Sequence, residues 1–350
     1  MRRSAGGAPS LPFVRDDELP PARVVAGIDE AGLGPLLGPL TIGYGAFRVP
    51  APGLDLWRAL GAAVRPAGEP EDERLLVADS KVVYSPGPRG LARLESVALA
   101  FHALAARTGR PPSSGRELLA RIPADLDSAV PLSAEPWADR LPERLPFRAD
   151  PAAVERHAQE IGSAMRAAGI ELLCAGVRVL PVAELNDSFS RTRNKSRTHW
   201  DLSAAVLRRI WREQAEDGVD LLVDRHGGRM RYGPLLRETF PEASVTAVDE
   251  RKERSEYLLR ARIREGVPSR MRVVFAERAE SASLAVALAS CLAKHAREVC
   301  MHAFNAFFGA LQPDLAPTAG YVSDGRRWLL QAGPALRRAG LEAKDLVRER

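Results

Sequence analysis

The chain has 350 residues, of which 45% are hydrophobic and 27% charged, a composition typical of a soluble globular protein. No apolar run approaches the roughly 20 residues that span a bilayer, and the first twenty residues lack the apolar core of a signal peptide. Three cysteines without metal-ligand or redox spacing fit a reducing cytosol, so we expect a cytoplasmic protein with no membrane partner. The net charge of +5 favours a polyanionic partner.

Strand-like and helix-like segments alternate along the chain, which predicts an α/β fold with helices packed on a sheet. In the first half we expect strands at 23–29 and 40–49, an extended piece at 74–84, a helix at 89–107 and an irregular, proline-rich insertion at 108–152. The second half predicts helix 152–168, strand 170–180, helix 201–216, strands 219–224, 244–248 and 271–276, and helices 281–307 and 324–338, with another insertion at 249–268. Residues 1–21 are interpreted as a disordered lead-in, 22–340 as one domain and 341–350 as a tail.

The first predicted strand ends in two adjacent carboxylates, Asp29 and Glu30, and continues into a turn rich in glycine and proline. Side chains alternate across a strand, so the two acids converge only where the strand breaks, and the glycines permit such a break. One interpretation is a divalent cation held between the strand end and the turn. The other is a surface turn with an accidental acidic pair.

Two further carboxylates lie where other predicted elements begin or end. Asp224 follows a short apolar strand, and Glu280 begins a long helix, where a carboxylate also serves as an N-terminal cap. Together the acids would form an oxygen-rich nest for hard cations. The six histidines show no HxH or HExxH spacing, and His226 is interpreted as a surface-turn residue in preference to a proton shuttle.

The order of these motifs resembles that of the prokaryotic type 2 ribonucleases H, the ribonucleases HII and HIII. Their DEAGRGPLAGP signature is similar to DEAGLGPLLGP here, and their DSK motif is similar to ADSK at 78–81. Their later motifs resemble VRVLPVAELND, LLVDRHGG, AESASLAVALASCLAK and GYVS, which follow in the same order within roughly residues 22–335. The resemblance implies a ribonuclease H-like fold, with a central mixed β-sheet flanked by helices and interrupted by insertions.

By this resemblance, the metal-binding and catalytic quartet of the family falls on Asp29, Glu30, Asp224 and Glu280. It implies a monomeric endoribonuclease that uses two Mg²⁺ or Mn²⁺ ions to cut the RNA strand of RNA/DNA hybrids, or ribonucleotides embedded in duplex DNA. The products would carry a 5′-phosphate and a 3′-hydroxyl. Glu280 resembles ribonuclease HIII, whereas the EAG turn and Tyr321 resemble ribonuclease HII, so the chain combines motifs of both subgroups.

Substrate contacts implied by the resemblance fall on the glycine turn and on three positions elsewhere: Gly32, Leu33, Gly34, Lys81, Tyr321 and Ser323. Leu33 stands where the family has an arginine, so a guanidinium that would reach a phosphate is missing. Two alternatives stay open: an ordinary half-buried aromatic for Tyr321, and a local ion pair with Asp79 for Lys81.

Two basic clusters would provide a track for a nucleic-acid duplex, or else form solvated loops. The first contains Arg191, Arg193, Lys195 and Arg197, and the second contains Arg225, Arg229 and Arg231. Beside a ribonuclease H, two functions stay open: a catalytically weak protein of the same fold that binds nucleic acid, and a two-metal nuclease acting on DNA junctions. Retention of four mutually repelling carboxylates favours the ribonuclease.

Overall fold

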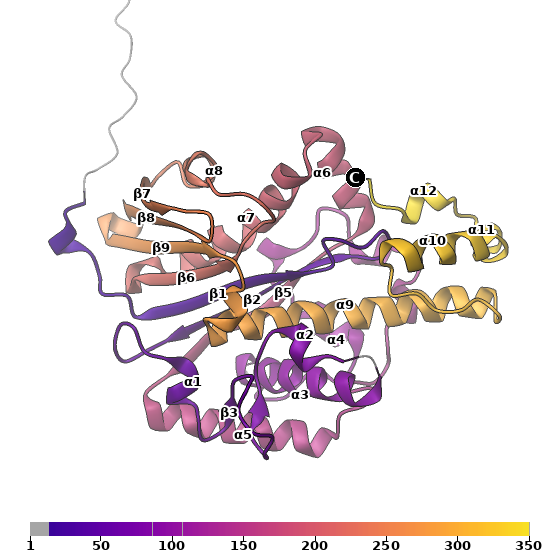
Figure 1. Cartoon of the computed structure of the whole chain (residues 1–350), viewed down its shortest axis with the longest axis horizontal. Helices are drawn as coiled ribbons and strands as arrows, with labels where there is room; N and C mark the ends of the chain where they lie inside the picture. Colours follow the sequence, from indigo (N-terminus) through magenta and orange to yellow (C-terminus); the bar gives the residue numbers. More distant parts are fainter. Residues whose placement is uncertain (1–13, 86, 107, 350) are drawn as a thin grey trace, which may run out of the picture.

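The computed structural model describes residues 14–85, 87–106 and 108–349, so most of the predicted lead-in lies outside the described residues. Its centre is a seven-stranded sheet in the order β5-β2-β1-β6-β9-β8-β7 (Figure 1). The strands are β1 Val24–Ala31, β2 Leu40–Arg48, β5 Glu171–Leu180, β6 Val219–Asp224, β7 Ser244–Glu250, β8 Arg254–Arg262 and β9 Pro268–Ala276. β1, β6 and β9 are parallel and the other neighbours antiparallel, so the sheet is mixed.

Helices cover both faces of this sheet (Figure 1). On one face lie α9 (Leu284–Leu311), α3 (Pro88–Ala105) and α5 (Pro151–Ala168), and on the other α6 (Val182–Thr192), α7 (Lys195–Gln214) and α8 (Gly233–Thr239). Side chains alternate between the two faces along each strand, so the strands contribute to a separate hydrophobic core on each face of the sheet. The predicted fold class, an α/β protein with a central mixed sheet flanked by helices, is therefore confirmed.

Helix α9 lies close against β1 and β2. A Cβ atom at Gly27 would lie 2.3 Å from the backbone of Ala285, and one at Gly43 would lie 2.0 Å from the carbonyl oxygen of Ala289. The alanines along α9 allow the same close approach from the helix side. This contact fixes the start of α9 relative to the carboxyl end of β1, where the predicted acids lie.

Several predicted boundaries are wrong for identifiable reasons. Residues 249–268 contain strand β8, whose buried Ser255, Tyr257 and Leu259 alternate with mostly charged residues that conceal the strand period. Helix α7 begins at Lys195 because Asn194 caps it, accepting a hydrogen bond from the Arg197 amide at 3.0 Å. The helix expected at 324–338 is divided into α10 (Val322–Gln331) and α11 (Gly333–Ala339), since the glycine-proline pair at 333–334 begins a new helix.

The remaining segments are mostly short elements. Residues 74–84 form β4 (Leu75–Leu76), paired with β3 (Val64–Arg65), and helix α2 (Ser80–Val83), while α1 covers Leu56–Ala59. The insertion 108–152 is largely irregular, as predicted, but includes α4 (Gly115–Ala120). Part of the predicted lead-in, Asp16–Glu18, forms ion pairs with β8, and the predicted tail contains α12 (Ala343–Leu346). Among the described residues, no helix is both long and apolar enough to cross a membrane.

Candidate metal centre

Strand β1 extends beyond its parallel neighbour β6. Pairing with β6 ends at Ile28 opposite Val223, whereas pairing with β2 continues to Ala31. Asp29 and Glu30 therefore lie within a regular strand, and the expected break at this point is not observed. Their side chains point to opposite faces: Asp29 lies beside Ser290 of α9, which helps to lower its pKa, and Glu30 lies 3.7 Å from His199 of α7.

Three carboxylates share the α9 face. Asp29 also accepts a hydrogen bond from the Glu30 amide at 2.8 Å. Asp224 is the last residue of β6 and accepts a hydrogen bond from the Ala279 amide at 3.4 Å. Glu280 lies in the short 3₁₀ turn Ala279–Ser281, which precedes α9, so it is not within the first turn of the long helix as predicted. The structure thus brings these acids together from three separate segments.

The electrostatics of the four acids reflect this crowding. Burial is the main cause that raises the pKa of each carboxyl group. The charge of Asp224 raises the pKa of Asp29, Glu30 and Glu280 further, and the charge of Asp29 adds to the shift of Glu30. Each ionised carboxylate makes ionisation of its neighbours less favourable. A bound divalent cation, which prefers oxygen ligands, would relieve the repulsion between the ionised carboxylates.

Helix α2 brings a fifth acid and one lysine to the same place. Asp79 caps α2, accepting a hydrogen bond from the Lys81 amide at 3.0 Å, and its Oδ2 atom lies 3.8 Å from Lys81 Nζ. Burial opposes the charge of Lys81, but Asp79, Glu280, Asp29 and Asp224 together raise its pKa. The local ion pair therefore exists, and the exposed lysine also lies within the field of the acids. Asp79 is not among the predicted site residues, although its place in ADSK is a signal for it.

The glycine-rich turn after β1 is held by two buried arginines that no sequence motif singles out. Arg297 of α9 donates from Nη2 to the carbonyl oxygens of Leu37 at 3.3 Å and Ala319 at 3.0 Å. A Cβ at Gly32, where φ is +90°, would lie 2.5 Å from Arg297 Nε. Arg348, in the predicted tail, donates to the carbonyl oxygens of Gly32 and Gly38. The turn is therefore fixed by α9 and by the chain end.

The remaining predicted substrate contacts surround this turn. Leu33 lines a small cavity with Phe189 and His199, while Gly34 is exposed. Tyr321 is 49% exposed, and the Arg297 guanidinium lies 5.6 Å from its ring centroid. Ser323 is exposed in the first turn of α10. Tyr321 and the glycine turn thus both lie against one buried cation, Arg297.

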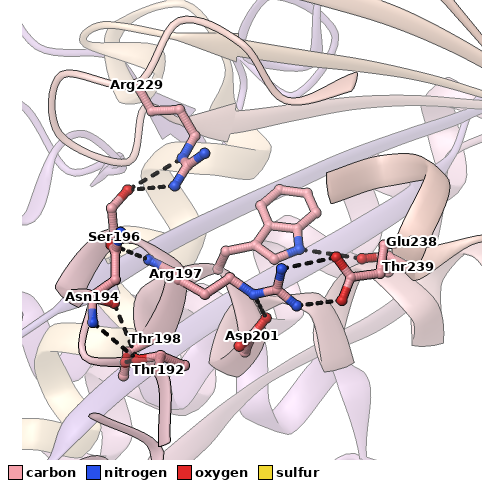
Figure 2. A network of polar contacts seen from close by, with 10 residues as sticks. Thr192, Asn194, Ser196, Arg197, Thr198, Asp201, Arg229, Glu238 and Thr239 are labelled. Carbon is pink, nitrogen blue, oxygen red and sulfur yellow. Dashed lines mark hydrogen bonds and ion pairs between the residues drawn. The ribbon is translucent and has the colours of Figure 1, made fainter. Parts of the chain in front are cut away.

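The first basic cluster belongs to two helices and is not a loop. Arg191 in α6 forms an ion pair with Asp187 at 2.8 Å, and Arg193 ends that helix. Lys195 and Arg197 occupy the first turn of α7. Arg197 donates to Asp201 at 2.7 Å and to Glu238 at 2.8 Å, within the network of Figure 2. Much of the charge of Arg197 is therefore balanced inside the protein.

The second basic cluster is also engaged. Arg225 forms an ion pair with Glu277, and Arg231 Nε lies 3.9 Å from Glu250. Arg229 donates to the Ser196 hydroxyl at 2.7 Å, joining the turn after β6 to the start of α7 (Figure 2). These contacts give the cluster a role in holding the turn that follows Asp224.

Two buried histidines lie on the α7 face beside Glu30. The surface position predicted for His226 is wrong: the residue is 4% exposed, and His199 is 3% exposed. Their ring centroids are 3.9 Å apart. Burial lowers the pKa of His199 to about 4 and that of His226 well below its usual value. Both imidazoles are therefore neutral near pH 7. No short-range spacing in the sequence connects them, because they come from α7 and the turn after β6.

No protein-family model matches this sequence. No curated protein matches it either. Solved structures similar to the chain are type 2 ribonucleases H. A chain of the PCNA:RNase HII complex from Archaeoglobus fulgidus shares 17% identity over 93% of this chain and 94% of that one, with a TM-score of 0.40. The ribonuclease H2 from Pyrococcus horikoshii shares 15% identity over 93% and 92%, with a TM-score of 0.38. Bst-RNase HIII in complex with Mn²⁺ shares 14% identity over 95% and 67%, with a TM-score of 0.42.

Proposed function

We propose that this protein is a divalent-cation-dependent endonuclease that cuts the RNA strand of RNA/DNA hybrids or ribonucleotides embedded in duplex DNA. The observation that carries the proposal is that Asp29, Asp224 and Glu280 share the α9 face at the carboxyl ends of β1 and β6, while Glu30, on the other face of β1, still feels the charges of Asp29 and Asp224. Burial and mutual repulsion raise the pKa of all four, an unfavourable arrangement for the protein alone. Perturbed carboxylates gathered in this way are a mark of functional sites.

The donor set fits Mg²⁺ or Mn²⁺, because these hard cations prefer carboxylate oxygens. The four acids would hold two such ions. Bound ions would activate water for in-line attack on a phosphodiester and stabilise the departing 3′-oxygen. The Glu30 amide orients Asp29 through a hydrogen bond of 2.8 Å, and the Ala279 amide orients Asp224. Lys81, exposed beside the acids, supplies positive charge where a substrate phosphate would approach.

Selectivity for a ribonucleotide requires contact with its 2′-hydroxyl group. The backbone of Gly32, Leu33 and Gly34 is suited to that contact because Arg297 and Arg348 hold the turn in place. Tyr321, which lies against Arg297, would pack against the sugar. Leu33 provides no guanidinium at the position where the resembling family has an arginine, so we expect backbone groups to carry the discrimination.

The test uses four end-labelled substrates: an RNA/DNA hybrid, a DNA duplex with one ribonucleotide, plain duplex DNA and a branched DNA junction, each with Mg²⁺ or Mn²⁺. Cleavage of either ribonucleotide-containing substrate, with 5′-phosphate products, is expected. Asp224→Asn should abolish cleavage, since it removes one charged ligand. Asp220→Asn is the matched control, because Asp220 lies on the same strand at its other end and pairs with Arg270 at 3.3 Å.

Salt-dependent binding without cleavage of any substrate would replace the nuclease with a nucleic-acid-binding protein. Cleavage of plain branched DNA but not of ribonucleotides would point to a junction nuclease. Equal loss of activity in Asp220→Asn and Asp224→Asn would contradict the assignment of the carboxyl end of β6 as the site.

A further inference from the structure

We propose a transition-metal site formed by Glu30, His199 and His226 on the α7 face of the sheet, suited to Zn²⁺. One carboxylate and two imidazoles are a common ligand set for zinc, with a fourth position left for water or substrate. The site stands on its own residues, and only its effect on cleavage rests on the proposed nuclease function.

The geometry brings three donor groups together in the interior. Their ligand atoms all lie within 4.8 Å of one another. Zinc bonds of about 2.0–2.2 Å place tetrahedral ligand atoms roughly 3.4 Å apart, so the side chains need to close by about an ångström. Glu30 Oε2 is already 3.7 Å from His199 Nε2.

Two of the ring nitrogens need a partner. Throughout the described part of the chain, neither His199 Nε2 nor His226 Nδ1 meets a hydrogen-bonding group, although both atoms are buried. A buried polar atom without a partner costs free energy, and such atoms in a folded protein call for an explanation. A metal ion that accepts a lone pair from each nitrogen provides one.

The surroundings keep both imidazoles in the neutral form that binds metal ions. Metal ligation requires neutral histidine, and burial together with the charges of Lys195 and Arg229 disfavours protonation of His199. The same two cations would also oppose an incoming metal ion, and the carboxylate of Glu30 offsets them. The His226 ring lies 6.1 Å from Trp200 and 6.0 Å from Tyr232, measured between centroids, so an aromatic wall restricts its movement.

Zinc binding at this site would affect the proposed Mg²⁺ centre. Glu30 is shared, because it also belongs to the proposed Mg²⁺ centre. A zinc ion on the α7 face would draw the Glu30 carboxylate towards His199 and His226 and away from Asp29. On the proposed nuclease function, Zn²⁺ would therefore inhibit cleavage in the presence of Mg²⁺, and loss of either histidine would relieve the inhibition.

The test titrates untagged, metal-free protein with Co²⁺ in excess Mg²⁺, followed by visible absorption. We expect saturation at one equivalent, displacement by Zn²⁺ and indifference to further Mg²⁺. His199→Gln and His226→Gln should each weaken Co²⁺ binding by at least about tenfold. His295→Gln is the matched control, since His295 is 0% exposed and both its ring nitrogens lack a partner among the described residues, yet it belongs to α9.

X-ray absorption of the Zn²⁺-loaded wild-type protein decides the case without any variant. Backscattering from two imidazoles supports the site, and a shell of oxygen atoms alone overturns it. Unchanged Co²⁺ binding in both histidine variants would overturn it as well. Asp224→Asn separates the two proposals: it should lose cleavage while keeping the Co²⁺ band. Cleavage without a Co²⁺ band would support the nuclease proposal and overturn the zinc site. A Co²⁺ band without cleavage would support the zinc site and overturn the nuclease proposal.

Discussion

The two faces of the sheet at the end of β1 are built from different chemistry. Towards α9 lie Asp29, Asp224 and Glu280, which offer only oxygen ligands. Towards α7 lies Glu30, accompanied by two buried imidazoles. One residue of sequence separates these environments, because a strand turns successive side chains to opposite faces. An Asp-Glu pair in a regular strand can thus serve two kinds of cation, while acids at a broken strand end would serve one.

The largest expected effect tests the α9 face. Asp29→Asn should reduce hybrid cleavage by roughly 10³-fold or more, because a catalytic cation loses a charged ligand. The same change should stabilise the metal-free protein at alkaline pH, because burial and the charges of Asp224 and Glu280 raise the pKa of Asp29 to about 8 and so oppose its ionisation. Cleavage rates and thermal unfolding in a chelator measure both effects. A variant that loses activity and is also less stable would mean that Asp29 is mainly structural.

The close contact of α9 with the sheet gives the next effect. Gly43 pairs with Asp29 in the sheet, and a Cβ there would lie 2.0 Å from the carbonyl oxygen of Ala289. Gly43→Ala should therefore destabilise the protein by about 3 kcal/mol, in the range for overpacked cores. Gly45→Ala is the control on the same strand, where the new atom meets a movable Leu288 methyl group at 3.3 Å. Urea unfolding that gives equal losses for both would contradict the contact.

Sequence patterns single out the acids of the α9 face but not the histidines of the α7 face. Asp224 ends its strand and Glu280 lies just before α9, while Asp29 is marked by the glycine-rich turn that follows β1, and the order of the motifs along the chain connects the three. His199 and His226 are joined only by the packing of α7 against the turn after β6, so no local pattern brings them together. Arg297 and Arg348 escape prediction for the same reason, since an arginine in a helix or near a chain end usually faces solvent. Strand β8 escapes it because its more exposed face is mostly charged.

Opposite pH dependence should distinguish the buried carboxylates, which include Glu30 on the α7 face, from the buried histidines in metal-free protein. On the α9 face the folded carboxyl groups have raised pKa values and hold protons that the unfolded chain releases, so stability falls as pH rises above about 4. On the α7 face the pKa of His199 is lowered to about 4, so stability from this group rises with pH between about 4 and 6.5. Its full size is about 3 kcal/mol.

Variants separate these opposing contributions in unfolding experiments across this pH range. Asp29→Asn should remove part of the loss of stability with rising pH, and His199→Gln should remove the gain in stability between about pH 4 and 6.5. Addition of Mg²⁺ should reduce the fall, because cation binding favours ionised carboxylates. A rise that persists in His199→Gln would show that the histidine does not titrate as its burial requires.

The smallest effect concerns Lys81, which lies beside the acids but is 86% exposed at its side chain. Lys81→Ala should weaken hybrid binding by roughly tenfold at low salt, in line with the loss of one phosphate contact, and the salt dependence of binding should become shallower. Arg191→Ala is a useful comparison, because Arg191 is exposed but paired with Asp187 at 2.8 Å. Lys81 is not a ligand of the Glu30, His199 and His226 site, although its charge also lowers the pKa of Glu30, so its loss should change Co²⁺ binding there far less than it changes hybrid binding. Altered Co²⁺ binding with unchanged hybrid affinity in Lys81→Ala would contradict this expectation. It would mean that Lys81 acts mainly on the carboxylate of Glu30, so that the two metal sites influence each other through this shared ligand.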